Sequence, residues 1–442
     1  MIRKFKKNIG LIIILVILVA FPTSLSNQTK INMRVIVTGI AVDKSGEEFE
    51  VTAQIIKPTA GSQTAGSSAS IDYITDKGKT LASAVSKMSF KAGKASAFSH
   101  TNFVILGKDM LQEDVSESLD YFIRDKIIKN SALILFSEEK ASDEIKKTKN
   151  TDLSVGMGLQ KVFLFKEYES DGLMTTTMEF LNSNKSLSKT AVVSVLSLKS
   201  NDESSSDGQS SSGEQTTESS SSSQSSDKES KSSESQDSGG SSSSGQGSGG
   251  SSSSGQSSGE ESKNQYFVSQ TPLLMFLDGK YAGKLEGQDE VTGYMLVKSE
   301  AKAIDMTIDS SDEERLKDSK IEIQVKNMRS YQKLRYEGNV PCVDIKVKIY
   351  NAEINEVLCK DIVASLDDKE YQTIKKDLEK EISKRVAACF SKAKEAKVDI
   401  FEAYEQAYRE KYKITSSNYK TMEEFLEKLK LNVEVDIRKL DY

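Results

Sequence analysis

One stretch of the chain, from Lys199 to Asn264, contains almost nothing that a folded protein can bury. It is made mostly of Ser, Gly, Gln, Glu and Asp, so no apolar burial offsets the entropy lost on ordering it. We therefore predict a long disordered Ser/Gly-rich insertion. Roughly 65 flexible residues have an end-to-end distance of ~45 Å and can still close. Replacing a six-residue loop by such a segment costs only about 2 kcal/mol of additional closure entropy.

The residues on either side of this insertion have the composition of strands. Thr190–Leu198 precede it and Thr271–Leu277 follow it, both rich in apolar residues. We therefore place the insertion inside one middle domain and not between two domains. The chain then divides into an N-terminal mixed α/β domain at 31–150, a middle domain at 151–310 interrupted by 199–264, and a C-terminal α+β domain at 311–442.

The first thirty residues, 1–30, have the features of an export segment. A basic cluster between Arg3 and Lys7 precedes the apolar run Ile9–Phe21, which Pro22 closes. A helix of that length reaches only ~20 Å, against a hydrocarbon core of ~30 Å. This length favours a cleaved signal peptide, and an uncleaved membrane anchor extending to about Ser26 is the alternative. Either interpretation places the protein outside the cytoplasm.

Charge and cysteine content exclude some classes of protein. The formal net charge is -6, with 60 basic and 66 acidic residues, so no basic field attracts nucleic acid. There are three cysteines, Cys342, Cys359 and Cys389, and so small and odd a number argues against a disulfide scaffold. Pairing of Cys342 with Cys359 requires a turn near Tyr350, where no Gly or Pro marks one.

The N-terminal region alternates between strand and helix patterns. Val35–Pro58 predicts an antiparallel hairpin around Asp43–Glu48, with Phe49, Val51, Ala53 and Ile55 on one face and Glu50, Thr52 and Gln54 on a wet face. Amphipathic spacing then predicts helices at 79–92, 110–124 and 141–149, and short apolar runs predict strands at 103–106 and 132–136. This order indicates a mixed α/β domain.

Beyond the insertion, strands precede helices. Gly279 and Gly283 bracket an expected turn, and extended segments are predicted at 294–297, 301–308, 321–325 and 343–349. A long helix is predicted from Asp367 to about Lys394, followed by a helix at 400–412 and a closing strand at 431–437. The fold class is therefore α+β, with two to three mixed domains whose antiparallel or mixed sheets are covered by helices.

The sequence offers no recognisable catalytic, cofactor or metal site. The single histidine, His100, has no signature of a nucleophile or orienting acid beside it, and we expect its imidazole to bond to neighbouring backbone. One His and three distant Cys do not provide zinc spacing. The pairs Asp367-Asp368 and Glu423-Glu424 are expected to complement helix N-termini.

Three further patterns look functional but have simpler explanations. Tyr404, Tyr408 and Tyr412 recur every four residues, which is typical of a packed helix face, with a ligand-stacking stripe as the alternative. Gly255–Gly259 satisfies G-x-S-x-G and Gly245–Gly250 satisfies G-x-G-x-x-G, but neither follows a strand or opens a helix. We interpret both as chance matches within the Ser/Gly tract.

Several segments, in order, resemble the Ger(x)C family, the C subunits of spore nutrient-germinant receptors. They are Val35–Asp43, Val51–Pro58, Ser99–Gly107, Leu119–Asp125, Pro272–Gly283, Ala387–Tyr412 and Leu431–Ile437, with Val398-Asp399-Ile400 at the position of the family's Asp-containing helix start. The resemblance implies three mixed α/β domains and a non-enzymatic subunit on the outer face of the spore inner membrane. It also implies assembly with a multi-pass A subunit and a transporter-like B subunit.

The chain departs from this family at its membrane attachment. The family typically carries a lipobox cysteine followed by Trp-Asp, whereas Leu25 lies near that position here and the first cysteine is Cys342. Attachment to the membrane surface would then depend on an uncleaved Ile9–Phe21 helix or on protein partners. Two other hypotheses remain: an exported cell-surface or ligand-binding protein unrelated to sporulation, and a secreted hydrolase with His100 as base.

Overall fold

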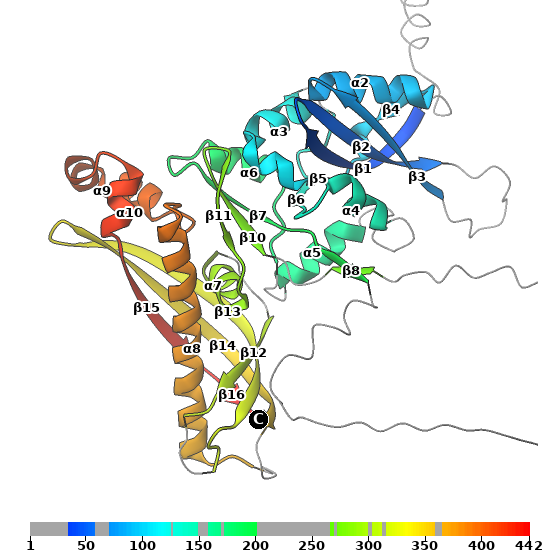
Figure 1. Cartoon of the computed structure of the whole chain (residues 1–442). Helices are drawn as coiled ribbons and strands as arrows, with labels where there is room; N and C mark the ends of the chain where they lie inside the picture. Colours follow the sequence, from blue (N-terminus) through cyan, green and yellow to red (C-terminus); the bar gives the residue numbers. More distant parts are fainter. Residues whose placement is uncertain are drawn as a thin grey trace, which may run out of the picture. The chain divides into compact units, whose positions relative to one another are not determined.

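The structure, a computed structural model, describes residues 34–57, 70–124, 127–148, 158–168, 172–200, 266–268, 272–298, 303–311, 315–358 and 365–442. The predictions for Ile9–Phe21, for Cys359 and for nearly all of the Lys199–Asn264 tract concern residues outside this set. The described residues form an α+β fold with several sheets, as the sequence predicted (Figure 1). Within these ranges, no helix is sufficiently long and apolar to cross a bilayer.

The N-terminal part is built on a six-stranded mixed sheet with the order β3-β2-β1-β5-β6. Strands β1 (Arg34–Ser45), β2 (Glu48–Lys57) and β3 (Ser70–Gly78) are antiparallel, whereas β5 (Phe103–Leu106) and β6 (Leu133–Phe136) run parallel to β1. The short strand β4 (Ala95–Ala97) also pairs with β1. The predicted hairpin is confirmed, with Gly46 in the left-handed region at φ 63° in its turn.

The predicted wet face of this hairpin is wrong. Thr52 and Gln54 are fully buried, because α4 (Ala141–Lys147) and the residue that follows it cover that side of the sheet. Thr38 Oγ1 donates to Gln54 Oε1 at 2.8 Å, and Gln54 Nε2 donates to Thr148 Oγ1 at 3.0 Å. A polar residue at an alternating position is therefore buried here with hydrogen-bond partners, as burial requires.

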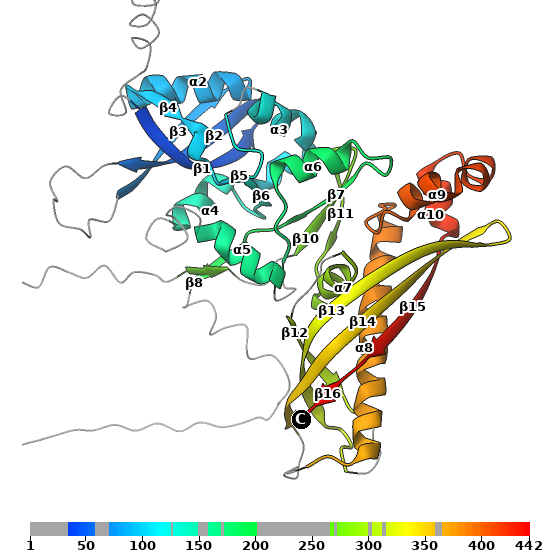
Figure 2. The same cartoon turned by 180° about the vertical axis from the view of Figure 1, so that it is seen from behind.

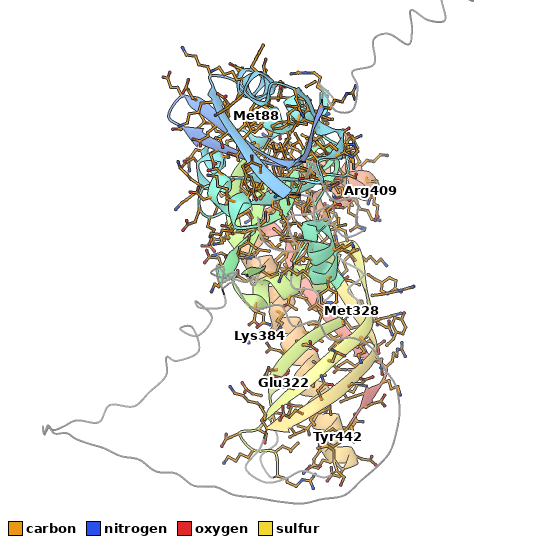
Figure 3. All side chains as sticks on the ribbon, turned by 90° about the vertical axis from the view of Figure 1, so that its right-hand side faces the viewer. Met88, Glu322, Met328, Lys384, Arg409 and Tyr442 are labelled. Atoms are coloured by element: carbon orange, nitrogen blue, oxygen red, sulfur yellow. The ribbon has the colours of Figure 1, made fainter. Side chains whose placement is uncertain are left out.

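Helices cover both faces of the N-terminal sheet. Helices α2 (Leu81–Ala92) and α3 (Val115–Arg124) pack on one face, where Met88, labelled in Figure 3, is 1% exposed. Helices α4 and α5 (Gly158–Tyr168) contribute to a core on the other face. The strand at 103–106 and the helix at 79–92 agree with the sequence analysis to within two residues.

The predicted continuous helix at 110–124 is wrong at its start. Lys108–Gln112 form the 3₁₀ helix η3, and α3 begins only at Val115. The carboxylate of Asp114 accepts the N–H of Ser116 at 2.9 Å, which satisfies a free donor at the start of α3. Because an N-cap residue has extended backbone, Asp114 separates the two helical segments.

A three-stranded antiparallel sheet, in the order β11-β10-β7, lies between two hydrophobic cores. It contains β7 (Thr190–Ser194), β10 (Leu273–Leu277) and β11 (Lys280–Leu285). The strands flanking the Ser/Gly tract pair directly, with Leu273 opposite Ser194. Residues Val193, Leu274 and Phe276 join the core of α6 (Thr177–Asn184) and the N-terminal sheet. Their neighbours Val192, Leu273 and Met275 join the core beneath α8 (Asp368–Glu395).

The C-terminal part is a sheet in the order β12-β13-β14-β15, with β16 (Leu440–Asp441) beside β14. Strands β12 (Ala303–Asp309), β13 (Lys320–Glu337) and β14 (Val340–Leu358) are antiparallel, and β15 (Lys430–Ile437) is parallel to β14. The long helix α8 packs along one face of this sheet through Ile374, Leu378 and Ile382 (Figure 1). Figure 2 shows β13, β14 and β15 from the other face.

Three further helices complete this part: α7 (Gln288–Lys298), α9 (Ala403–Asn418) and α10 (Met422–Lys428). The sequence analysis assigned 294–297 to an extended segment, and this is wrong. Tyr294, Met295 and Val291 are buried on α7, whose apolar residues are too closely spaced to distinguish a buried helix from a strand. Gly283 also lies inside β11 and not in a turn.

The remaining short elements are η2 (Phe98–His100), β8 (Leu198–Ser200) and β9 (Tyr266–Val268). Strands β8 and β9 form a two-stranded sheet. The helix predicted to begin at Asp367 is confirmed: Asp367 is the N-cap residue of α8 and forms a reciprocal capping box with Glu370.

Candidate functional site

A cavity of about 200 Å³, hereafter the Asp399 cavity, opens where α6, β7, the end of α7 and the segment before α9 meet. Its wall combines apolar side chains with hydroxyl, carboxylate and amine groups. The lining residues are Leu173, Met174, Thr175, Glu179, Ser183, Thr190, Ala191, Val192, Tyr294, Lys298, Asp399, Ile400 and Glu402.

Asp399 is the most buried acid of this cavity, with 2% of its surface exposed. Its Oδ1 accepts the backbone N–H of Ala403 at 2.8 Å, and its Oδ2 accepts the N–H of Tyr404 at 2.8 Å. Ser188, which precedes β7, donates its Oγ–H to the same Oδ2 at 2.6 Å. The carboxylate therefore caps the N-terminus of α9 and links this helix to the segment before β7.

Burial raises the pKa of the Asp399 carboxyl above its ordinary value, while its three hydrogen bonds oppose the rise. The folded protein thus ionises this group less readily than an exposed aspartate. Both oxygens are already engaged by donors of the chain itself. This arrangement is that of a structural anchor, because a general base needs a lone pair directed at a substrate proton.

An ion pair lies on the wall of the cavity. Lys298, at the end of α7, pairs with Glu402, just before α9. Glu402 has a left-handed backbone at φ 54°, a conformation that costs a non-glycine residue free energy. Glu179 is occupied by the capping box of α6, where its carboxylate accepts the N–H of Thr176 at 2.8 Å.

The hydroxyl groups of the cavity wall have no catalytic partner among its lining residues. Its wall contains no histidine or cysteine, and its hydroxyl groups therefore have no imidazole or thiolate partner. Thr175 Oγ1 donates to the carbonyl of Val192 at 2.8 Å, which holds that hydroxyl in a structural contact. Throughout the described ranges, no cluster of His, Cys, Asp or Glu is arranged to hold a metal ion.

His100 lies away from this cavity, at the end of η2 on an exposed turn. The expected hydrogen bond from its imidazole to neighbouring backbone is wrong, since the ring has no hydrogen-bond partner in the part of the chain that the structure describes. The loop around it is held instead by main-chain bonds, including Thr101 N to the carbonyl of Phe98 at 2.9 Å.

The other residues singled out by sequence have structural positions. Tyr404 is buried and Tyr408 is partly buried, their rings 4.8 Å apart, whereas Tyr412 is 60% exposed. The free thiols of Cys342 and Cys389 are buried, and burial raises the pKa of both. The acids at helix starts lie where predicted: Asp367 and Asp368 begin α8, and Glu423 and Glu424 lie in the first turn of α10.

Asp43 is a second buried carboxylate whose role the sequence did not reveal. It lies near the end of β1 yet accepts the N–H groups of Ala141 at 2.7 Å and Ser142 at 2.9 Å, so it caps α4 across nearly a hundred residues of chain. Gly107 allows this contact, because an added Cβ there would lie 2.1 Å from the Asp43 carboxylate. No local pattern marks such a long-range cap.

The order of modules along the chain defines a class of protein. The model for the spore germination protein N-terminal domain matches residues 27–198, and that for the spore germination B3/GerAC-like C-terminal domain matches residues 273–439. These two matches account for both folded sides of the Ser/Gly tract. The chain therefore belongs to the GerAC-like family of spore germination proteins, which is the Ger(x)C family that the sequence resembles.

Two relatives agree in sequence with this assignment. The chain is 28% identical over 156 residues to a putative spore germination protein YfkR of Bacillus subtilis (strain 168), covering 34% of this chain and 40% of the relative. It is 26% identical over 107 residues to spore germination protein B3 of the same organism, covering 24% and 28%. The match thus spans less than half the length of either relative. A crystal structure of the GerBC protein aligns over 91% of this chain and 96% of that chain, with 14% identity and a TM-score of 0.47.

Proposed function

We propose that this protein is the C subunit of a spore nutrient-germinant receptor, a non-enzymatic component needed for receptor assembly and for the germination response. The observation that carries the proposal is the ordered match of both family modules, at 27–198 and 273–439. The two modules lie on either side of the 66-residue tract 199–264, in the order in which the N-terminal and C-terminal domains are named.

The chemistry of the described residues supports a role in contact. The buried carboxylates Asp43 and Asp399 use their oxygens to cap α4 and α9. The single imidazole, His100, is exposed on a turn. Among the described residues, these groups stabilise the fold, and none of them is arranged to activate a nucleophile.

The partners in this proposal are a multi-pass A subunit and a B subunit of the receptor, and the location is the outer face of the spore inner membrane. The basic and apolar residues of 1–30 support export. We also propose that the folded chain consists of three domains, at 31–150, 151–310 and 311–442. The three main sheets support a multi-domain organisation of this kind.

Deletion of the gene tests the proposal. Spores without the protein should lose the response to one class of nutrient, measured as loss of refractility, while vegetative growth stays normal. Wild-type protein and a His100→Ala variant should restore the response equally, because the imidazole has no catalytic role. Normal germination of the deletion strain would contradict the proposal. Failure of His100→Ala alone, with normal protein levels, would favour an enzymatic function.

A further inference from the structure

Figure 2 shows the face of the C-terminal sheet that is turned away from α8. The strand register places a cluster of cationic and tyrosine side chains on this face. They alternate with the buried residues Met328, Leu334, Val347 and Ile349 of β13 and β14, so strand geometry places them on the opposite face. We call this cluster the basic face. It consists of Arg329, Tyr331, Lys333, Lys346, Lys348 and Tyr350.

The pairing register brings these side chains together. Arg329 lies opposite Lys348 and Tyr331 lies opposite Lys346. Directly opposed residues in an antiparallel pair have Cβ atoms only about 5 Å apart, so the Arg329–Lys348 pair places two like charges side by side. Such a pair destabilises the isolated sheet and is relieved by an anion.

Two carboxylates lie opposite cations of the basic face, Asp344 opposite Lys333 and Asp436 opposite Lys348, but they pair instead with Arg335 and Arg438. Within the described ranges, Arg329, Lys333 and Lys348 form no ion pair, whereas Lys346 pairs with Glu434. The chain as a whole carries a net charge of -6, so this concentration of free positive charge is local. In the half of the sheet near β12, by contrast, Lys326 is neutralised by Glu353.

The aromatic side chains of the basic face are unusually exposed. Tyr331 has 47% and Tyr350 has 43% of its surface accessible, and the Lys348 Nζ lies 5.0 Å from the centre of the Tyr331 ring. Tyrosine combines an apolar ring with a polar hydroxyl and is enriched where protein meets the polar boundary of a membrane. Lysine and arginine extend their charges beyond such rings toward phosphate groups.

We propose that the basic face binds the surface of a membrane rich in anionic phospholipid. Free cations distributed over two strands match a membrane surface that presents many phosphate groups. None of the cavities described in this structure is lined by residues of the basic face, so this face offers no pocket for a single side chain of a partner. An acidic protein surface is the competing occupant, and the test separates the two. This inference does not depend on the proposed receptor function.

The absence of tryptophan from the chain provides a local probe. In full-length protein carrying Tyr331→Trp, the single indole reports the environment of the basic face. Tyr412→Trp is the matched control, because Tyr412 is 60% exposed on α9, outside the basic face. Each protein is mixed with vesicles of phosphatidylglycerol or of phosphatidylcholine, and the wavelength of maximum emission is recorded.

The proposal predicts a blue shift of the Tyr331→Trp emission with phosphatidylglycerol and none with phosphatidylcholine. The control indole should not shift with either lipid. Adding Arg329→Gln, Lys333→Gln and Lys348→Gln should abolish the shift and weaken binding of this face roughly a hundredfold, at about 1 kcal/mol per cation. A charge-matched triple variant at exposed lysines should retain the shift; its substitutions are Lys376→Gln, Lys380→Gln and Lys413→Gln.

Three results would overturn the proposal. They are an unchanged Tyr331→Trp spectrum with phosphatidylglycerol, an equal shift with both lipids, and an equal shift of the Tyr412→Trp control. Because the export segment 1–30 is present in every variant, its own affinity for lipid cannot produce a difference between them. A spectrum that stays unchanged with lipid but shifts with an acidic protein would assign the basic face to a protein partner.

Discussion

Replacing Asp399 by alanine should destabilise the folded chain strongly, because one carboxylate serves three donors. Asp399→Ala leaves the Oγ–H of Ser188 and the N–H groups of Ala403 and Tyr404 without their acceptor. A buried donor without a partner costs about 1–3 kcal/mol. Two effects reduce the total: water from the adjacent cavity can reach some of the donors, and the cost of burying the carboxylate disappears. We expect a loss of roughly 2–4 kcal/mol in the free energy of unfolding.

Urea unfolding followed by circular dichroism measures this loss. Asp399→Asn keeps one acceptor oxygen and should cost about half as much. A double-mutant cycle with Ser188→Ala should give a coupling energy of about 1 kcal/mol or more, since the two side chains are in direct contact. A loss below about 1 kcal/mol for Asp399→Ala, or strictly additive effects with Ser188→Ala, would refute the anchoring role.

Three other predictions follow from burial and packing. Burial raises the pKa of Asp43, so the folded chain holds this proton to higher pH than the unfolded chain, and the stability that this group contributes falls as the pH rises from 3.8 through the raised pKa. The difference in urea midpoint between wild type and Asp43→Asn should change with pH over the same range. Gly293→Ala places a Cβ 2.2 Å from the carbonyl oxygen of Arg385 and should lower the free energy of unfolding by about 1–3 kcal/mol, despite the better helix propensity of alanine. In the control Gly287→Ala, the nearest neighbour of the added Cβ is at 3.9 Å, and the free energy of unfolding should change by less than about 0.5 kcal/mol. The ring centre of Phe276 lies 5.0 Å from that of Phe136 and 5.4 Å from that of Phe180. Phe276→Ala removes both contacts and should lower the free energy of unfolding, measured in thermal or urea unfolding, by about 3–5 kcal/mol.

Local sequence signals were sufficient for elements whose pattern is unambiguous. The alternation of Phe49, Val51 and Ala53 predicted β2, and Asp367 predicted the start of α8 with its capping box. Both signals act within a few residues, so they do not depend on the rest of the fold. The α+β class followed from the order of these elements along the chain.

The features that the sequence missed depend on contacts between distant segments. Gln54 looks solvent-facing in its strand, but Thr148 reaches it from the other side of the sheet. Asp43 looks like a turn residue, but it caps a helix that begins at Ala141. Tyr294 belongs to a short apolar run, and such runs do not distinguish a buried helix from a strand.

The candidate site was predictable only in part. The resemblance placed Asp399 at a helix start, and the structure confirms that it caps α9. Its bond to Ser188, 211 positions away along the chain, has no sequence signature. The basic face was hidden for a similar reason, because its cations come from two strands whose register alone brings them together.

Purification of the tagged chain from spore membranes tests the central claim, that this protein works by contact within a membrane receptor. The account predicts that two multi-pass subunits co-purify with it in a constant ratio from detergent-solubilised inner membrane. It also predicts that the chain is absent from the cytosolic fraction. Recovery of the chain alone from the membrane, or in the cytosol, would contradict the account.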